Sequence, residues 1–453
     1  MTTATSPRNR LPLHRSHGDP PDEVWEVETE QEAQLNLAIV LELCAAGALR
    51  CSEKTGHPSA ATQQAVASRL VHGDFYPDTS IAAFAWPLLI RAGGLARNDG
   101  GRLRLTTKGR AAAKQPAADV LRTLWQRWTS HGLIDEFSRV EEVKGQRSRN
   151  VLTAVQPRRE AVVTAVSRLP VDEWMMVDVL FAAIRRQGLS PAIARNQMAR
   201  YKLYVGYSPE YGSLGYDDPD SWFQAEGRYI LTILFEYAAV LGLIDVTYVR
   251  AAGARNDIPD HGSCDGIDAL SRYDGLESVR LNRLGRYIVG QVDDYQRPTA
   301  DRSAPLIIDD NLAVTATEEL SLPDEQLLTR YADRHGDGWI FSRDSLLDAA
   351  AAGHPPEELT KSLRDRVDAE LPTGFRVLID DVTDRLDQLT DRGRVRLIEC
   401  RDPALAKLLA TDRTTKSSCR LIGDRQLAVP VEREVKFTAA VRKLGYVLPD
   451  LPS

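Results

Sequence analysis

Asp135, Glu142 and Lys144 have the residue types and spacing of a metal-dependent nuclease site. The tripeptide Glu142-Val143-Lys144 can hold Mg²⁺ with its acid while its lysine positions the attacking water. The run shows no strand pattern, such tripeptides are common by chance, and this one lies in the polar connector IDEFSRVEEVKGQRSRN. The favoured interpretation is a connector without catalytic function, and a cryptic nuclease is kept as an alternative.

A second cluster of side chains could bind a cation. Carboxylate, imidazole and thiolate groups all serve as metal ligands, and one short segment holds Asp257, Asp260, His261, Cys264 and Asp265. Their spacing matches no closed zinc pattern, and Gly, Asp and Pro are also the residues that an exposed loop needs. The favoured interpretation is a loop, and no metal is expected.

The sequence lacks the motifs of ATP hydrolysis and of nucleophilic catalysis. It contains neither GxxxxGKS nor GxxxxGKT and no DEAH-like box, so the phosphate cradle and the magnesium ligands of a helicase motor are missing. The segment Gly206-Tyr207-Ser208-Pro209-Glu210 fails the GxSxG pattern of a nucleophile elbow because its last glycine is missing. We therefore expect no catalytic residue, no cofactor and no enzymatic activity.

Basic side chains gather in two segments, RNDGGRLRLTTKGR and VKGQRSR, and indicate contacts with nucleic acid. Such residues neutralise phosphates and give a salt-dependent affinity without sequence information. The predicted DNA-binding residues are Arg97, Arg102, Arg104, Lys108, Arg110, Lys144, Arg147 and Arg149. Further candidates are Arg158 and Arg159 beside the second segment and Arg8, Arg10 and Arg15 in an N-terminal arm. For the first segment a solvated charged hairpin is an equal alternative, and for the second segment and the arm a solvated surface is the favoured interpretation.

Aromatic residues are concentrated between Tyr201 and Tyr229. Rings interleaved with basic residues can stack unpaired bases, which contributes about 1 to 3 kcal/mol for each stacked base. The same rings can anchor a protein partner or fill a small core beneath this insertion, and the core interpretation is favoured. The residues considered for an aromatic contact surface are Tyr204, Tyr207, Tyr211 and Trp222.

Composition limits where nucleic acid can bind and where the protein resides. A chain of 453 residues with 43% hydrophobic content can build several cores, and its net charge of −7 provides no general basic field, so DNA contacts must come from local patches. The five cysteines are scattered without a CxxC pair, as expected for reduced thiols. No apolar run approaches the roughly 20 residues of a membrane span, and the N-terminus lacks the apolar core of a signal peptide. We expect a cytoplasmic protein without a membrane partner.

The elements that must carry these residues are mainly helices in the first part of the chain. Residues 1–28 have almost no apolar periodicity and are expected to form a disordered arm. Helices are predicted over about 34–46, 58–72 and 80–93 from their periodic apolar residues. Ser59 is expected to cap the second helix.

A β-hairpin is predicted to follow these helices. The turn Asp99-Gly100-Gly101 lies between short segments in which leucine alternates with arginine, and a helix begins near Thr107. Three helices and a hairpin wing are the winged-helix order, and residues 151–295 repeat it in outline. The helices expected to read DNA, SIAAFAWPLLIRAGG and RYILTILFEYAAVLG, are almost wholly apolar, which favours packing over entry into a groove. DNA contacts are therefore expected on the wings.

The C-terminal region carries a resemblance to a known family. Its specific parts are the strand pair from Leu306 to Thr315, RVLIDDV, RVRLIECRDPALAKLL and the terminal LGYVLP. These resemble the N-terminal accessory domain of XPB-type DNA helicases, which is also found in bacterial helicase-associated proteins. The residues before about 290 resemble the winged-helix region of bacterial proteins with phrases such as PSAAT, AFAWPLL and EYAAVLGLIDV. The resemblance implies association with DNA processing and supplies no catalytic residue.

The predicted fold class is α+β and predominantly helical, with tandem winged-helix domains and a small α/β accessory domain. The expected boundaries are 1–28 for the disordered arm, 29–150 for the first winged-helix domain with its helical connector, 151–295 for the second with its aromatic insertion, and 304–450 for the accessory domain. The leading hypothesis is a non-catalytic DNA-associated protein that acts with a separate helicase or nuclease and binds the DNA backbone nonspecifically through its wings. The alternative is a protein interaction scaffold or regulator whose winged helices bind partners rather than DNA.

Overall fold

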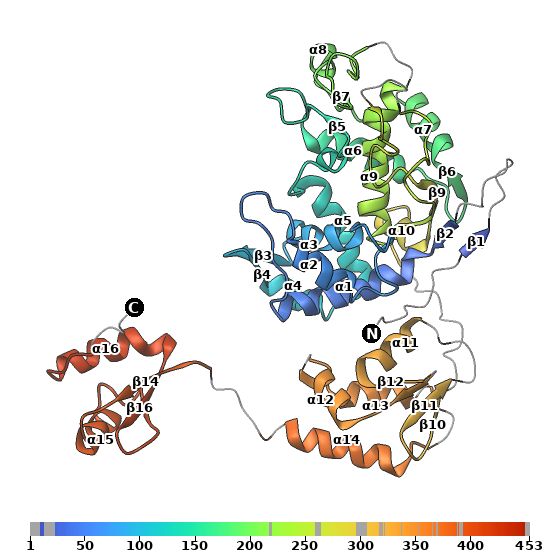
Figure 1. Ribbon diagram of the computed structural model, residues 1–453. Helices are drawn as coiled ribbons and strands as arrows, with labels where there is room; N and C mark the ends of the chain where they lie inside the picture. Colours follow the sequence, from blue (N-terminus) through green and yellow to red (C-terminus); the bar gives the residue numbers. More distant parts are fainter. Residues whose placement is uncertain are drawn as a thin grey trace.

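The computed structural model describes residues 10–12, 23–216, 220–258, 264–295 and, within 306–448, all but 317–319, 321, 337, 352, 365, 368–369, 387 and 389–392. The first module follows the predicted order of helices and hairpin (Figure 1). Its elements are α1 (Thr29–Ala45), α2 (Ala60–Ala67), α3 (Ala82–Ala92), β3 (Ala96–Asp99), β4 (Arg102–Leu105) and α4 (Thr107–Ala112). Ser59 caps α2 as predicted, because its side chain accepts a hydrogen bond from the Thr62 amide.

Helix α5 (Ala117–His131) leads from the first module into a second one of similar order. The elements of the second module are α6 (Val155–Val166), β6 (Trp174–Met176), α7 (Val177–Arg186), a long helical segment, β8 (Ile244–Tyr248), β9 (Leu276–Leu281) and α10 (Arg283–Ile288). The helical segment consists of α9 (Arg228–Thr232) between two π-helical stretches, η2 (Phe223–Gly227) and η3 (Ile233–Ala239). Smaller elements in between are η1 (Glu136–Arg139), β5 (Val143–Lys144), α8 (Gln197–Arg200) and β7 (Tyr204–Val205).

The junction from hairpin to helix has the same geometry in both modules. A Cβ atom on Gly109 would lie 2.1 Å from the Leu95 carbonyl oxygen, and one on Gly285 would lie 1.9 Å from that of Leu243. Each carbonyl belongs to the residue just before the hairpin, and in each module the side chain three residues before the glycine caps the helix. Both helices therefore press their first turn onto the residue that precedes the hairpin, which only glycine allows.

A five-stranded sheet in the order β1-β2-β8-β9-β6 joins the N-terminus to the second module. Strands β1 (Arg10–Pro12) and β2 (Glu23–Val27) lie within the arm that was expected to be disordered over 1–28, so the structure differs from the prediction there. The rings of Trp25 and Tyr248 stack with centroids 5.3 Å apart, and Trp25 and Val27 are buried. The short run of strand-forming residues folds because β8 supplies its partner.

One hydrophobic cluster runs from Trp25 to Ile288 and contains residues of both modules. Helix α3 packs against η3, so the two apolar helices cover each other. Every residue from Ala82 to Ile90 is buried, and so is every residue of η3. Neither helix is exposed for insertion into a DNA groove.

Buried ion pairs connect the elements around this core. Glu236 of η3 accepts from Arg139, with Nη2 and Oε2 2.9 Å apart, and the Arg228 guanidinium binds Asp274 at 3.1 Å. Arg139 and Arg228 are almost fully enclosed, so their charges require these carboxylates. The pairs join distant stretches of the chain and make the insertion part of the same core.

The residues after 305 form two separate groups of elements instead of one (Figure 1), and each group has its own hydrophobic cluster. The first surrounds an antiparallel sheet in the order β10-β11-β13-β12, and the second surrounds a sheet in the order β14-β16-β15. The first group consists of β10 (Leu306–Ile308), β11 (Ala313–Ala316), α11 (Leu322–Tyr331), β12 (Asp333–His335), β13 (Gly338–Ile340), α12 (Arg343–Ala351), α13 (Pro356–Arg364) and α14 (Thr373–Leu386). The second consists of β14 (Val395–Glu399), α15 (Pro403–Thr411), β15 (Arg420–Leu421), β16 (Gln426–Pro430), η5 (Val431–Arg433) and α16 (Glu434–Lys443).

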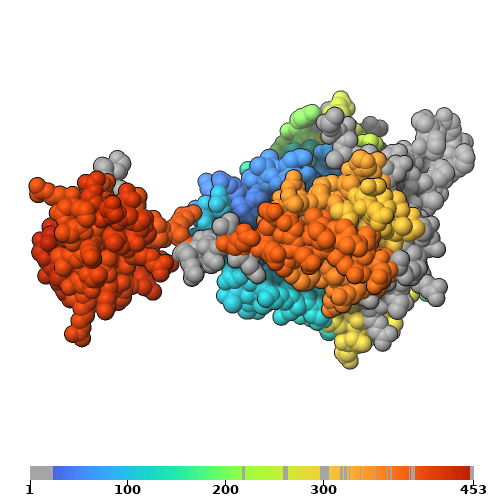
Figure 2. All heavy atoms as spheres, turned by 90° about the horizontal axis from the view of Figure 1, so that it is seen from below, coloured from blue at the N-terminus to red at the C-terminus, as the bar shows by residue number. Residues whose placement is uncertain are grey.

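Within this region the predicted strand pair β10–β11 and the helix that contains RVLIDDV are both present. Helix α11 packs against α1, and Figure 2 shows the first C-terminal group, in yellow and orange, beside the first module, in blue and cyan. Among the described helices none is long and apolar enough to cross a membrane.

Candidate nucleic-acid interface

The hairpin β3–β4 presents its arginines on one solvent-exposed face. Arg97 lies opposite Arg104 and Asp99 lies opposite Arg102 in the register of the two strands, so these four residues share a face. The opposite face carries Leu103, which is fully buried. The alternation read from the sequence therefore separates a core face from a charged face.

This charged face has more positive than negative groups. Arg104 Nε is 3.0 Å from Asp99 Oδ2, and both side chains are more than half exposed. Arg97 and Arg102 make no ion pair with any residue that the structure describes. Like charges directly opposite each other destabilise a hairpin, so the Arg97–Arg104 pair does not contribute to folding. An anionic ligand would relieve this repulsion.

Lys108 and Arg110 extend the basic surface from the hairpin onto α4, and both are exposed. The Arg110 guanidinium donates to the Leu105 carbonyl oxygen at 3.0 Å, which holds it against the base of the hairpin. Lys108 has no ion-pair partner in the described part of the chain. The five predicted residues of the first segment are thus all exposed on the hairpin and on the helix that follows it, and together they are named the wing surface.

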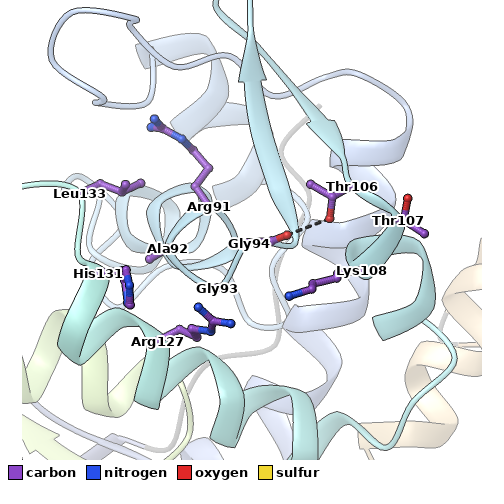
Figure 3. A pocket seen from close by; sticks show the side chains of 10 residues that line it. All are labelled: Arg91, Ala92, Gly93, Gly94, Thr106, Thr107, Lys108, Arg127, His131 and Leu133. Carbon is purple, nitrogen blue, oxygen red and sulfur yellow. Dashed lines mark hydrogen bonds between the residues drawn. The ribbon is translucent and has the colours of Figure 1, made fainter.

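A cleft of about 570 Å³ adjoins the wing surface. Its walls come from the end of α3, the start of α4 and the end of α5 (Figure 3). The titratable residues that line it are Arg91, Lys108, Arg127 and His131, and all of them are basic. This cleft brings together residues that are far apart in the sequence.

Arg127 and His131 were not predicted as functional residues, although the sequence contains a signal for them. They are four residues apart on α5 and therefore lie on one face of the helix. The apolar stripe of α5, which includes Trp125 and Trp128, is buried, so the two basic residues lie on the outer face. The amphipathic pattern of α5 could have revealed an exposed basic pair. It could not have revealed that Lys108 and the end of α3 lie beside this pair.

Some basic residues of the second segment and beside it are exposed, and others form ion pairs within the protein. Arg147 and Arg149 are exposed in the loop after β5, whereas Lys144 Nζ lies 3.1 Å from Glu142 Oε2. Arg158 and Arg159 are buried in ion pairs, so their candidacy for DNA contact was wrong. Their partners are the carboxylates of Asp135 and Glu136, which lie 23 residues earlier in the chain. The sequence does not show that these residues meet.

The aromatic residues of the insertion also divide into two groups. Tyr207 and Tyr211 are 79% and 68% exposed, while Tyr204 is partly buried in β7. The Trp222 ring packs against Phe181 and its Nε1 donates to the Ser190 hydroxyl at 3.2 Å. The core interpretation therefore describes Trp222, and the surface interpretation is available to Tyr207 and Tyr211.

Three of the candidate metal ligands make ion pairs with basic residues. Asp135 Oδ2 is 2.6 Å from Arg158, Glu142 pairs with Lys144, and Asp257 pairs with Arg228. In the part of the chain that the structure describes, no three His, Cys, Asp or Glu side chains are grouped to hold a metal ion. Asp260 and His261 of the second cluster, and Arg8 and Arg15 of the arm, lie outside the described residues.

A comparison with protein families finds a match in the C-terminal region. A family model described as "Helicase conserved C-terminal domain" matches residues 306–422. The match includes the first C-terminal cluster and continues through β14, α15 and β15, and it stops before β16. The C-terminal region is thus similar to a helicase-associated domain. No curated protein matches the chain.

Proposed function

We propose that this protein is a non-catalytic accessory factor that binds the DNA backbone nonspecifically through its wing surface and acts with a separately encoded helicase or nuclease. The observation that carries the proposal is the exposed face of β3–β4, on which three arginines are balanced by one aspartate. Phosphate contacts from such a face fix the position of a protein on DNA without reading its sequence. The burial of α3 and η3 supports the same assignment, because DNA can reach the exposed face of β3–β4 but not these two helices.

The tandem winged-helix fold and the XPB-like identity of the C-terminal region belong to this proposal. The repeated hairpin-to-helix junction at Gly109 and Gly285 supports a duplicated module. In the first module an isolated bridge between Arg50 and Arg102 adds a third short strand to the hairpin, as β6 does beside β9 in the second. The helicase-type match supports a role beside a motor, and the matched residues contain no phosphate-binding motif of their own.

The test is a titration of fluorescent duplex DNA at several salt concentrations. Replacing Arg97, Arg102 and Arg104 by Glu is expected to lower the affinity at least tenfold near 100 mM salt and to reduce the slope of log K against log salt by about 2 to 3. A charge-matched control changes the exposed Arg186, Lys407 and Arg413 to Glu and should leave both quantities nearly unchanged. If both triple variants lost the same DNA affinity, the effect would reflect only the change in net charge, and the wing surface would not be a specific DNA-binding site.

A protein-binding scaffold is the alternative function. The apolar third helices no longer favour it, since α3 and η3 cover each other. A different observation supports it: Leu397 of β14 and Val435 of α16 are apolar residues that are 58% and 85% exposed, and a partner protein could cover them. Absence of any DNA binding by the wild-type protein at low salt would leave the scaffold as the better proposal.

A further inference from the structure

The cleft beside the wing has a charge distribution that the fold does not require. In Figure 3 the ends of Lys108 and Arg127 point toward each other across the cleft, and His131 lies on the Arg127 side. Neither Lys108 nor Arg127 makes an ion pair with a described residue. Two cations that face each other without a counter-ion repel, so this arrangement is suited to an anion between them.

The other two basic residues are partly engaged. The Arg91 guanidinium donates to the Gly56 carbonyl oxygen at 2.7 Å, which turns it toward the rim of the cleft. His131 Nδ1 lies 2.8 Å from the Ser130 hydroxyl, and no described residue bonds Nε2. Lys108, Arg127 and His131 therefore provide the groups that remain for a ligand, and Arg91 adds positive charge behind them.

Gly93 explains why these residues can meet. A Cβ atom at this position would lie 2.2 Å from Leu124 Cδ2, so the glycine lets α5 approach the end of α3 closely. The basic end of α5 is thereby brought beside the start of α4, where Lys108 lies. Gly93 is thus part of how the sequence builds the cleft.

The chemistry of the cleft fits a phosphate group. Arginine and lysine bind phosphate through charge-assisted hydrogen bonds, and the lining contains no acid that would repel it. The walls offer Leu133 and Ala92 but no Phe, Tyr or Trp on which a base could stack. The cleft is also continuous with the wing through Lys108, so a polymer that follows the wing surface reaches it.

From these observations we infer that the cleft binds a backbone phosphate of the same DNA that the wing contacts, with Lys108, Arg127 and His131 as its ligands. This inference rests on the proposed function. It makes α5, a helix outside the hairpin, part of the DNA-binding surface. The wing then holds one stretch of backbone and the cleft a neighbouring phosphate.

The test compares Arg127→Gln with Arg122→Gln in the full-length protein. Arg122 is on the same helix, but its guanidinium lies over the Tyr287 ring, 4.6 Å from the centroid, and outside the cleft. In DNA titrations Arg127→Gln should weaken binding roughly three- to tenfold at low salt and lower the salt slope by about 1, as expected for one lost phosphate contact. Arg122→Gln should match the wild type, and unchanged melting temperatures would show that both variants fold.

The possible outcomes separate this inference from the proposed function. If the wing variant loses affinity while Arg127→Gln behaves like Arg122→Gln, the cleft inference is overturned and the wing remains. If the wild type binds no DNA, the proposed function fails, and the inference fails with it in this form. In that case a titration with inorganic phosphate that saturates for the wild type but not for Arg127→Gln would assign the cleft to a free phosphate ligand instead.

Discussion

Arg158 and Arg228 are buried arginines whose guanidinium groups bind carboxylates inside the protein. Removing either partner of such a pair leaves a desolvated charge, which costs about 3 to 5 kcal/mol. Arg97 and Arg127, in contrast, are exposed and have no counter-ion among the described residues. The first kind of arginine is required for the fold, and the second carries a charge that no described residue balances. Burial and pairing, more than residue type, separate the two roles.

Glu136 is a buried acid whose charge is only partly compensated. Its Oε1 accepts from Arg159 Nε at 2.9 Å, while its Oε2 has no hydrogen-bond partner. Burial raises the pKa of Glu136 from 4.5 to about 7, against the lowering effect of Arg159. Because the folded protein holds this proton more tightly than the unfolded chain, Glu136 adds stability below about pH 4.5 that is lost as the pH rises through about 7.

Glu136→Gln is therefore expected to change the pH dependence of stability. The free energy of unfolding of the wild type should fall relative to the variant by about 2 to 3 kcal/mol between about pH 5 and pH 7.5. Urea denaturation at a series of pH values measures this difference. Glu160→Gln, at an exposed position of the same helix as Arg159, serves as the control. Parallel stability curves for wild type and Glu136→Gln would contradict the raised pKa.

At the scale of elements, local rules account for the parts of the fold that the sequence predicts. The cap at Ser59 and the turn at Asp99–Gly101 depend on neighbouring residues only, so their patterns indicate the helix and the hairpin directly. Strand β2 depends on β8, with Trp25 paired to Tyr248, and nothing near Trp25 identifies this partner. The cleft requires the ends of α3, α4 and α5 to meet. The sequence could predict that the residues of the cleft are basic and exposed, but it could not predict that they lie close together.

The two hairpin-to-helix junctions lead to a prediction about glycine. Gly109→Ala and Gly285→Ala would each place a Cβ about 2 Å from a backbone carbonyl oxygen, and backbone cannot move aside cheaply. Each variant should be destabilised by about 1 to 3 kcal/mol in thermal or urea denaturation. Gly374→Ala is the control, because its Cβ would meet other atoms only at 3.7 Å or more and α14 gains a better helix former. A neutral result at one junction alone would contradict the equivalence of the two modules.

At the scale of the whole molecule, α1 connects the first module to the region that matches the helicase-type family. Glu42 of α1 accepts a hydrogen bond from His354 Nε2 at 2.7 Å, and an Arg330 Nη2 atom lies 3.6 Å away. Burial alone would raise the pKa of Glu42, but the hydrogen bond and the positive charges of His354, Arg330 and Arg69 outweigh it and lower the pKa. The carboxylate thus stays charged where it joins the first module to the first C-terminal group.

This contact predicts how the two regions separate. Because the pKa of Glu42 is lowered in the folded protein, its contribution is fully present above the ordinary value of 4.5 and is lost only as the pH falls through the lowered value. Glu42→Gln should weaken the contact by about 1 kcal/mol at neutral pH, while Glu357→Gln, at an exposed position of α13, should not. Small-angle scattering would show a larger radius of gyration for Glu42→Gln at neutral pH, and for the wild type only in acid. Identical radii for all three proteins at neutral pH would mean that the packing of α11 on α1 holds the regions together without this carboxylate.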